Sequence, residues 1–182
     1  MGRGASGSGS GFGGKKGGGA LARNLAAHEK IIRGNDSFET LTAFDENGNM
    51  LFSKKGGPHS VEYGAEGPKT TNAVVTHNHP SGASFSSDDV GGMVFFNQKE
   101  MRATGKEYTF SLKRPAKGWG VSWTTAQSRF KRAYTKALND YHKQAPGKSD
   151  TARRKLWIDL THKYNGEAAK SFGWNYSVKK NK

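Results

Sequence analysis

Residues 72–80 read Asn-Ala-Val-Val-Thr-His-Asn-His-Pro, and this stretch decides the fold. The run from Asn72 to His77 is short, apolar and rich in β-branched residues, which is typical of a central buried strand. Alternate residues of a strand point to the same face, so His77 and His79 are expected side by side, close enough to bind one metal ion. Pro80 cannot donate to a ladder and ends the strand.

The chain after the histidines supplies an acidic group. Ser81-Gly82 is expected to reverse the chain, and Ser86-Ser87-Asp88-Asp89 has the composition of a helix start, with a Ser cap and acidic residues in the first turn. An aspartate from this helix, Asp88 or Asp89, would complete a His, His, Asp set. With water in the fourth position, that set is typical of a catalytic zinc site.

A carboxylate that is not a ligand would be needed to take a proton from the water. Glu39 is the first candidate because it lies on an early predicted strand beside the histidines, and Glu62 is the second. The sequence contains no cysteine, so a zinc site must use His, Asp or Glu, and disulfides are excluded.

The string His77-Asn78-His79-Pro80-Ser81-Gly82, followed by Ser86 and Asp89, resembles the motif of the JAB/MPN (JAMM) metalloproteins, and RadC-type bacterial members share the His-Asn-His-Pro-Ser-Gly run. The resemblance implies a JAB-like fold that binds zinc through His77, His79 and Asp89. It also implies that Glu39 acts on the water and that Ser86 polarises the scissile carbonyl of a peptide or isopeptide bond.

The spacing departs from the family in one respect. Six residues separate His79 from Ser86, one fewer than is usual in that family. Strict spacing would match Ser87 and place Val90 where the aspartate belongs. A one-residue deletion in the turn keeps Ser86 and Asp89 in register, and Asp88 is then the alternative ligand.

A wider likeness covers about residues 38–115. The order Glu-Thr, Phe-Asp-x-x-Gly-x-x-Leu, Lys-Gly-Gly, Thr-His-Asn-His-Pro and Phe-Ser-x-x-Asp is similar to small domains of bacteriophage head-associated proteins and of bacterial toxin-like proteins. It implies a phage or mobile-element origin. A toxin or effector is therefore a further alternative.

The fold class predicted for the whole chain is α+β: a small mixed β-sheet with flanking helices, JAB-like. We expect a disordered Gly-rich tail at 1–20, an α+β domain at 21–123 and a basic helical extension at 124–182. Helices are predicted at 21–33, 86–100, from 125 and from 149 or 150; strands are predicted at 38–44, 50–52, 59–63, 72–77, 108–112 and 120–123. The last aromatic residues, Phe172 to Tyr176, are expected to pack back on the domain.

The net charge of +14 is concentrated late in the chain, because residues 113–182 hold 17 Lys or Arg against 4 Asp or Glu. Such a segment attracts nucleic acid or another polyanion, although a well-hydrated helical surface has the same composition. No run is apolar enough for a membrane span. We therefore expect a protein of the cytoplasm of a bacterial host, with association with a virion as the alternative location.

The leading functional hypothesis is zinc-dependent hydrolysis of a peptide or isopeptide bond in a protein or peptide substrate. The alternative is a non-catalytic, virion-associated or nucleic-acid-binding protein that uses residues 113–182.

Overall fold

The computed structural model describes residues 16–182. Helix α1 (Lys16–Ile32) is its first element. Of the segment predicted to be disordered, residues 1–15 lie outside the described part, and residues 16–20 belong to α1.

Six strands form one mixed sheet in the order β2-β1-β3-β4-β5-β6. The strands are β1 (Thr40–Phe44), β2 (Met50–Lys55), β3 (Val74–Asn78), β4 (Glu100–Thr104), β5 (Tyr108–Lys113) and β6 (Asn175–Lys180). Only β3 and β4 are parallel among these neighbours; the other pairs are antiparallel. The predicted α+β class with a mixed sheet is confirmed.

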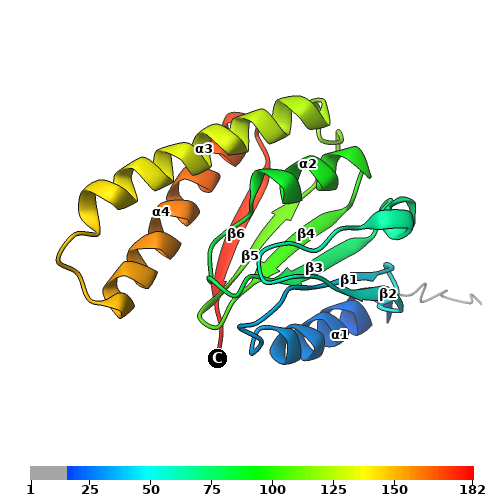
Figure 1. Cartoon of the computed structure of the whole chain (residues 1–182). Coiled ribbons are helices and arrows are strands. Elements are labelled where there is room, and N and C mark those ends of the chain that lie inside the picture. Colours follow the sequence, from blue (N-terminus) through cyan, green and yellow to red (C-terminus); the bar gives the residue numbers. More distant parts are fainter. Residues whose placement is uncertain (1–15) are drawn as a thin grey trace, which may run out of the picture.

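Helices cover the two faces of the sheet unequally (Figure 1). Helix α1 packs on one face, where Leu25 contacts Phe44 and Val74 in a small apolar cluster. Helices α2 (Ser87–Phe95), α3 (Trp123–Gln144) and α4 (Asp150–Ser171) lie on the other side, over the main core. A short 3₁₀ helix, η1 (Gly64–Thr70), precedes β3. No helix among residues 16–182 is long and apolar enough to cross a membrane.

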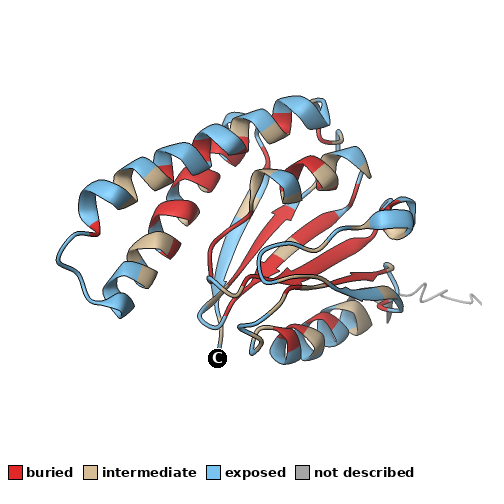
Figure 2. Cartoon of the chain, in the orientation of Figure 1, coloured by how far each residue is buried: buried red, intermediate tan, exposed pale blue. Residues whose placement is uncertain are grey.

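Strand β3 is the buried centre predicted from its composition, because every one of its residues is buried between β1 and β4 (Figure 2). Val75 belongs to the core under α2, whereas the Thr76 hydroxyl donates to Glu29 of α1 at 3.1 Å. A fully buried valine contributes about 1.5–3 kcal/mol. Because side chains alternate between the two faces of a strand, His77, two residues after Val75, points to the same face as Val75, towards α2.

The C-terminal segment returns to the sheet. Strand β6 pairs with β5, and Trp174, just before it, is buried and donates from Nε1 to the carbonyl of Trp119 at 2.9 Å. The boundary expected after residue 123 falls in the first turn of α3, and residues of α3 and α4 share the main core with the sheet. The expected packing of Phe172 to Tyr176 against the domain is confirmed.

Two predicted strands are wrong. Residues 59–63 form an irregular loop rather than a strand. Residues 120–123 are not a strand either, because Gly120 adopts a positive φ of 71° and Ser122 caps α3, accepting a hydrogen bond from the Thr125 amide.

The helix predicted to reach residue 100 ends at Phe95. Asn97 adopts a left-handed φ of 52°, which stops the helix, and the chain then enters β4, a strand that the pattern did not predict. The helices predicted from 125 and from 149 or 150 are confirmed as α3 and α4, with Ser149 capping α4.

Candidate metal centre

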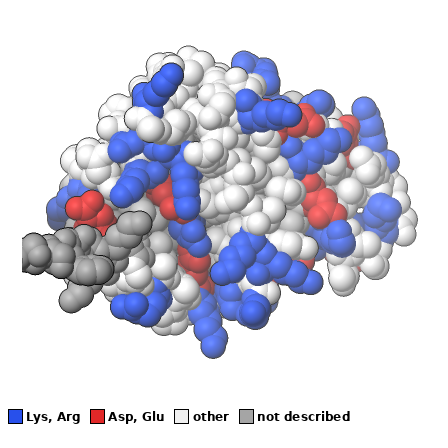
Figure 3. Space-filling view, turned by 180° about the vertical axis from the view of Figure 1, so that it is seen from behind, with Lys and Arg blue, Asp and Glu red and all other residues white. Residues whose placement is uncertain are grey.

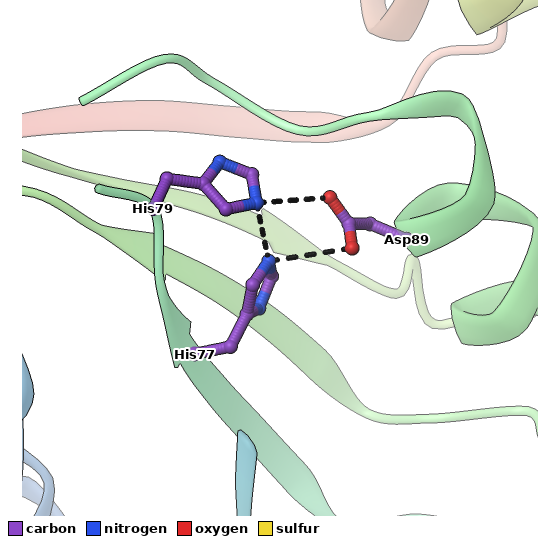
Figure 4. A group of neighbouring side chains, drawn as sticks. All are labelled: His77, His79 and Asp89. Atoms are coloured by element: carbon purple, nitrogen blue, oxygen red, sulfur yellow. Dashed lines mark hydrogen bonds and ion pairs between the residues drawn. The ribbon is translucent and has the colours of Figure 1, made fainter. Parts of the chain in front are cut away.

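The end of β3 and the first turn of α2 bring three side chains together (Figure 4). The Nε2 atoms of His77 and His79 are 2.9 Å apart. Asp89 places Oδ1 at 3.3 Å from Nε2 of His77 and Oδ2 at 3.3 Å from Nε2 of His79. The three residues thus offer one nitrogen each from two imidazoles and a carboxylate, a set that could hold a metal ion.

The local structure fixes Asp89 by helix capping. The Ser86 hydroxyl accepts from the Asp89 amide at 3.1 Å, and the Asp89 carboxylate accepts from the Ser86 amide at 2.7 Å. This reciprocal capping box orients the carboxylate towards the sheet. The carboxylate of Asp88 instead accepts from Gln127 Nε2 at 2.9 Å, so it is Asp89 that lies beside the histidines.

The ring of His79 is oriented by its second nitrogen. Nδ1 lies 3.0 Å from the carbonyl oxygen of Ala83, which can only accept, so Nδ1 carries a proton and donates it. In the neutral ring, Nε2 then has a free lone pair, as a metal ligand requires. Nδ1 of His77 is buried and has no hydrogen-bond partner among the described residues.

The spacing of the three side chains suits a metal ion, as a comparison with zinc geometry shows. Zn–N and Zn–O bonds of about 2.0–2.1 Å in a tetrahedron put neighbouring ligand atoms about 3.3 Å apart. The 2.9 Å between the two Nε2 atoms and the 3.3 Å from each Nε2 to a different oxygen of Asp89 are close to that value. Two imidazole lone pairs facing each other also repel unless a cation or a proton lies between them. The donor set therefore suits a metal ion, and its chemistry does not by itself select which metal.

The charges of the cluster are strongly coupled. Burial opposes ionisation of Asp89, but the adjacent His77 and His79 hold its pKa well below the usual range. Burial likewise lowers the pKa of His79, whereas hydrogen bonding to Asp89 and the charges of Asp89 and Glu39 raise it, giving a pKa of about 9. Without a metal, a proton on His79 would take the place of the cation at neutral pH.

Glu39 lies beside this cluster because of strand register. Leu41 pairs with His77 across β1 and β3, so Glu39, two residues before Leu41, comes opposite His79 on the same face. Glu39 is buried, with 7% of its surface exposed. Burial raises the pKa of its carboxyl group, although His79 and His77 act in the opposite direction.

Ser86, Glu39 and His79 open onto the same space. A pocket of about 380 Å³ is lined by all three and continues to Tyr134, Trp157 and Thr161 of α3 and α4. A second pocket, of about 470 Å³, is lined by the same three residues. Its other walls come from the loop after β2, from α2 and from Phe96, and Glu62 is exposed on this side. The cluster therefore lies where the two pockets meet.

Two features of the site were not predicted. Asn78, between the histidines, is buried and bonded to the chain on both sides of Glu39. Trp157 of α4 and Tyr134 of α3 line the first pocket. The hydrogen bonds of Asn78 could have been expected from its place at the end of a buried strand, since a buried amide must find partners. The position of Tyr134 and Trp157 at the pocket depends on how α3 and α4 pack against the sheet.

Comparison of the chain with protein-family models, with curated proteins and with solved structures found no match.

Proposed function

We propose that the protein is a metal-dependent hydrolase of the JAMM type that cleaves a peptide or isopeptide amide. One observation carries the proposal: the Nε2 atoms of His77 and His79 and the carboxylate of Asp89 converge at the spacing of metal ligands, at the junction of two pockets. Zinc is the metal that best suits two imidazoles and one carboxylate with an open fourth position.

A zinc ion held there would supply a Lewis acid and a water molecule of lowered pKa. Glu39 is the proton carrier in this proposal: it lies opposite His79, and its raised pKa brings it closer to neutral pH, where a group that both takes and returns a proton works best. It would accept the proton of the water and deliver it to the leaving amine.

Ser86 would assist the carbonyl. Its Oγ already accepts a hydrogen bond from the Asp89 amide, which leaves the hydroxyl proton free to be donated into the pocket. A donor aimed at the oxygen that gains negative charge typically contributes about 10²–10³ in rate. The same contact keeps Ser86 in a fixed position at the start of α2.

The two pockets support a polymeric substrate. They meet at Glu39, His79 and Ser86 and extend from there in two directions, towards α3 and α4 and towards the loop of residues 59–64. An extended peptide crossing the site would place residues on either side of its scissile bond in these two spaces. A small amide would fill only one of them.

The first experiment measures metal and cleavage together. Purified protein should contain about one equivalent of zinc, which the double variant His77→Ala/His79→Ala should lose. Glu39→Gln, which keeps the ligands, should retain the zinc and cleave a peptide library about 10²–10⁴-fold more slowly. Protein that binds no zinc or other divalent metal would refute the metal site. Bound zinc with equal cleavage by wild type and Glu39→Gln would refute the assigned mechanism.

A further inference from the structure

The face of the sheet opposite the metal centre is only partly covered. Helix α1 packs over β1 and β3. Of the side chains of β4, β5 and β6 that point away from the main core, Lys113 and Lys179 are exposed, whereas Glu100, Thr104, Thr109 and Ser111 are buried. A groove of about 720 Å³ follows this open face, with α1 as one wall. Its lining residues include Leu21 and Leu25 on the α1 side, and none of its lining side chains is aromatic.

Basic side chains line the rim of this groove. Lys30 comes from α1, Arg33 from the turn directly after it, Lys113 from β5 and Lys179 from β6, and Lys182 follows β6. We call these five residues the basic rim. These residues come from distant parts of the sequence, and Lys30 and Arg33 lie outside the basic segment 113–182. On the face drawn in Figure 3, Lys and Arg likewise predominate over Asp and Glu.

The acidic residues of the groove are already paired. Arg102, on β4, binds Glu29 through Nε at 2.5 Å and Nη2 at 3.1 Å, and binds Glu100 through Nη1 at 2.9 Å. Glu100 also accepts from the Ser111 hydroxyl at 2.7 Å. Lys113 of the basic rim also lies near Glu100, with 3.7 Å between its Nζ and Oε2, so the polar floor of one cation and two anions is in contact with one cation of the rim. The five positive charges of the basic rim outweigh the net negative charge of the floor, so the groove as a whole is positive.

The spacing of the rim fits a chain of anions better than a single one. Lys113 pairs with Asn175, and Thr109 pairs with Lys179, so Lys113 and Lys179 lie four rows apart, about 13 Å along the strands. On the facing wall, Arg33 follows the last residue of α1 and its amide still makes the helical hydrogen bond to the Glu29 carbonyl. Arg33 therefore lies about one turn beyond Lys30, about 4.5 Å along the axis. One small anion would meet one of these cations, whereas a phosphodiester backbone would meet several in succession.

We propose that this groove binds the phosphate backbone of a nucleic acid duplex without reading its sequence. Lysine, arginine, threonine and asparagine side chains, which line the groove, are the groups that contact phosphates in proteins. Without aromatic side chains among its lining, the groove offers no platform on which unpaired bases would stack. A membrane surface is disfavoured because the site is concave, and its apolar residues are held against the sheet.

Matched variants test this assignment. The triple variant Lys30→Glu/Lys113→Glu/Lys179→Glu reverses the charge of the basic rim. The control Lys131→Glu/Lys170→Glu/Lys180→Glu makes the same change in net charge at exposed positions. Lys180 is especially informative because it neighbours Lys179 on β6 but pairs with Tyr108, on the opposite face. Lys179→Gln, which removes one charge without reversing it, is a milder third variant.

Fluorescence anisotropy of the full chain with a labelled 20-base-pair DNA duplex gives the readout. Wild type and control should bind with a steep salt dependence. The rim variant should lose at least about tenfold in affinity, and its log–log salt slope should be smaller by about 0.9 for each phosphate contact removed. Circular dichroism before titration shows that each variant is folded. Lys179→Gln should fall between wild type and the rim variant.

Several outcomes would overturn the proposal. Wild type that does not bind the duplex would do so, as would an equal loss in the rim and control variants, which would show that binding follows the net charge of the protein rather than the groove. Equal binding of polyglutamate would identify an acidic protein as the partner, and binding only of vesicles with phosphatidylserine would identify a membrane. None of these results depends on zinc or cleavage, so this proposal fails or holds independently of the hydrolase.

Discussion

Asn78 holds the backbone on both sides of Glu39. Its Oδ1 accepts a hydrogen bond from the Thr40 amide at 2.7 Å, and its Nδ2 donates to the carbonyls of Phe38 at 2.9 Å and Asn35 at 3.1 Å. The side chain between the two candidate ligands thus fixes the segment that carries the candidate proton carrier. The two candidate ligands and Glu39 are thus connected through the hydrogen bonds of one buried amide.

Asn78→Ala should uncouple Glu39 from the metal centre. The change leaves the Thr40 amide and two carbonyls without their partner, at a cost of about 1–3 kcal/mol for each group that water cannot reach. Folded Asn78→Ala protein should keep its zinc and lose cleavage. A double-mutant cycle with Glu39→Gln checks the coupling, because the two losses should be far from additive. Loss of zinc in folded Asn78→Ala would show that Asn78 acts on the histidines instead.

Asp89→Asn and Asp88→Asn should separate the two neighbouring aspartates. Asparagine at position 89 can still accept from the Ser86 amide, so α2 keeps its cap, but a charged ligand is lost. Zinc affinity should fall by more than the 10–100-fold (about 1.4–2.7 kcal/mol) typical of an outer-shell change. Asp88→Asn should bind zinc as wild type does, because its carboxylate contacts Gln127. Titration with a competing chelator measures both, and equal affinities for the two variants would contradict the assignment.

The sequence predicted the parts of this site that depend on local rules. The β-branched run of β3 and the period of two put His77 and His79 on one face, and Ser86 marked the start of α2. The choice between Asp88 and Asp89 depends on the capping box, in which the third residue after the cap turns its carboxylate back. A resemblance in the motif favoured Asp89, and the capping geometry is the physical reason for its position.

The unpredicted elements depend on long-range pairing. Strand β4 alternates Glu100, Met101, Arg102 and Ala103, and Arg102 on its polar face bonds both to Glu100 of the same strand and to Glu29 of α1. Strand β6 pairs with β5 across about 60 residues that form two helices. Neither the contact with Glu29 nor the pairing of β5 with β6 can be recognised from a short stretch of sequence, because the residues that make it lie far apart in the chain. The wall that Tyr134 and Trp157 give to the first pocket is a consequence of that same return of the chain.

Trp157→Ala should change which peptides are cleaved. Trp157 lines the first pocket and packs edge to face with Tyr134, at 5.5 Å between ring centres. Removing the indole takes away the apolar surface that would contact such a side chain, so preference for a large apolar residue on that side of the scissile bond should fall by about tenfold or more. Phe95→Ala, which removes an exposed ring outside both pockets, is the control. Mass spectrometry of a cleaved peptide library gives the preference; an identical profile for Trp157→Ala would exclude it from the substrate site.

His28 should make the docking of α1 sensitive to acid. Burial lowers the pKa of His28 below its ordinary value of 6.5, although Glu29 partly opposes this, and the neutral ring bonds to the Thr42 hydroxyl at 2.7 Å. The unfolded chain therefore takes up a proton first as the pH falls, so stability is lost as the pH drops through about 6.5 and below. The stability difference between wild type and His28→Gln, from urea unfolding, should shrink from pH 8 to pH 5. A difference that is constant with pH would mean that His28 does not titrate on unfolding.

Gly105→Ala should disturb the metal centre from the far side of the turn that follows it. A Cβ at Gly105 would come within 2.8 Å of the Gly82 Cα and 3.6 Å of the His79 carbonyl oxygen, so the backbone of that turn would have to shift. Overpacking of this kind costs about 1–3 kcal/mol, and here it displaces the chain that orients His79, so zinc affinity should fall together with stability.

Gly166→Ala is the matched control: it lies inside α4, and its Cβ would meet Tyr176 at an ordinary 3.5 Å. That variant should keep wild-type zinc affinity and gain about 0.4–1 kcal/mol of stability from the less flexible unfolded chain. Thermal unfolding and chelator competition on the two variants check both quantities, and unchanged zinc affinity in Gly105→Ala would show that the turn can move without carrying His79 with it.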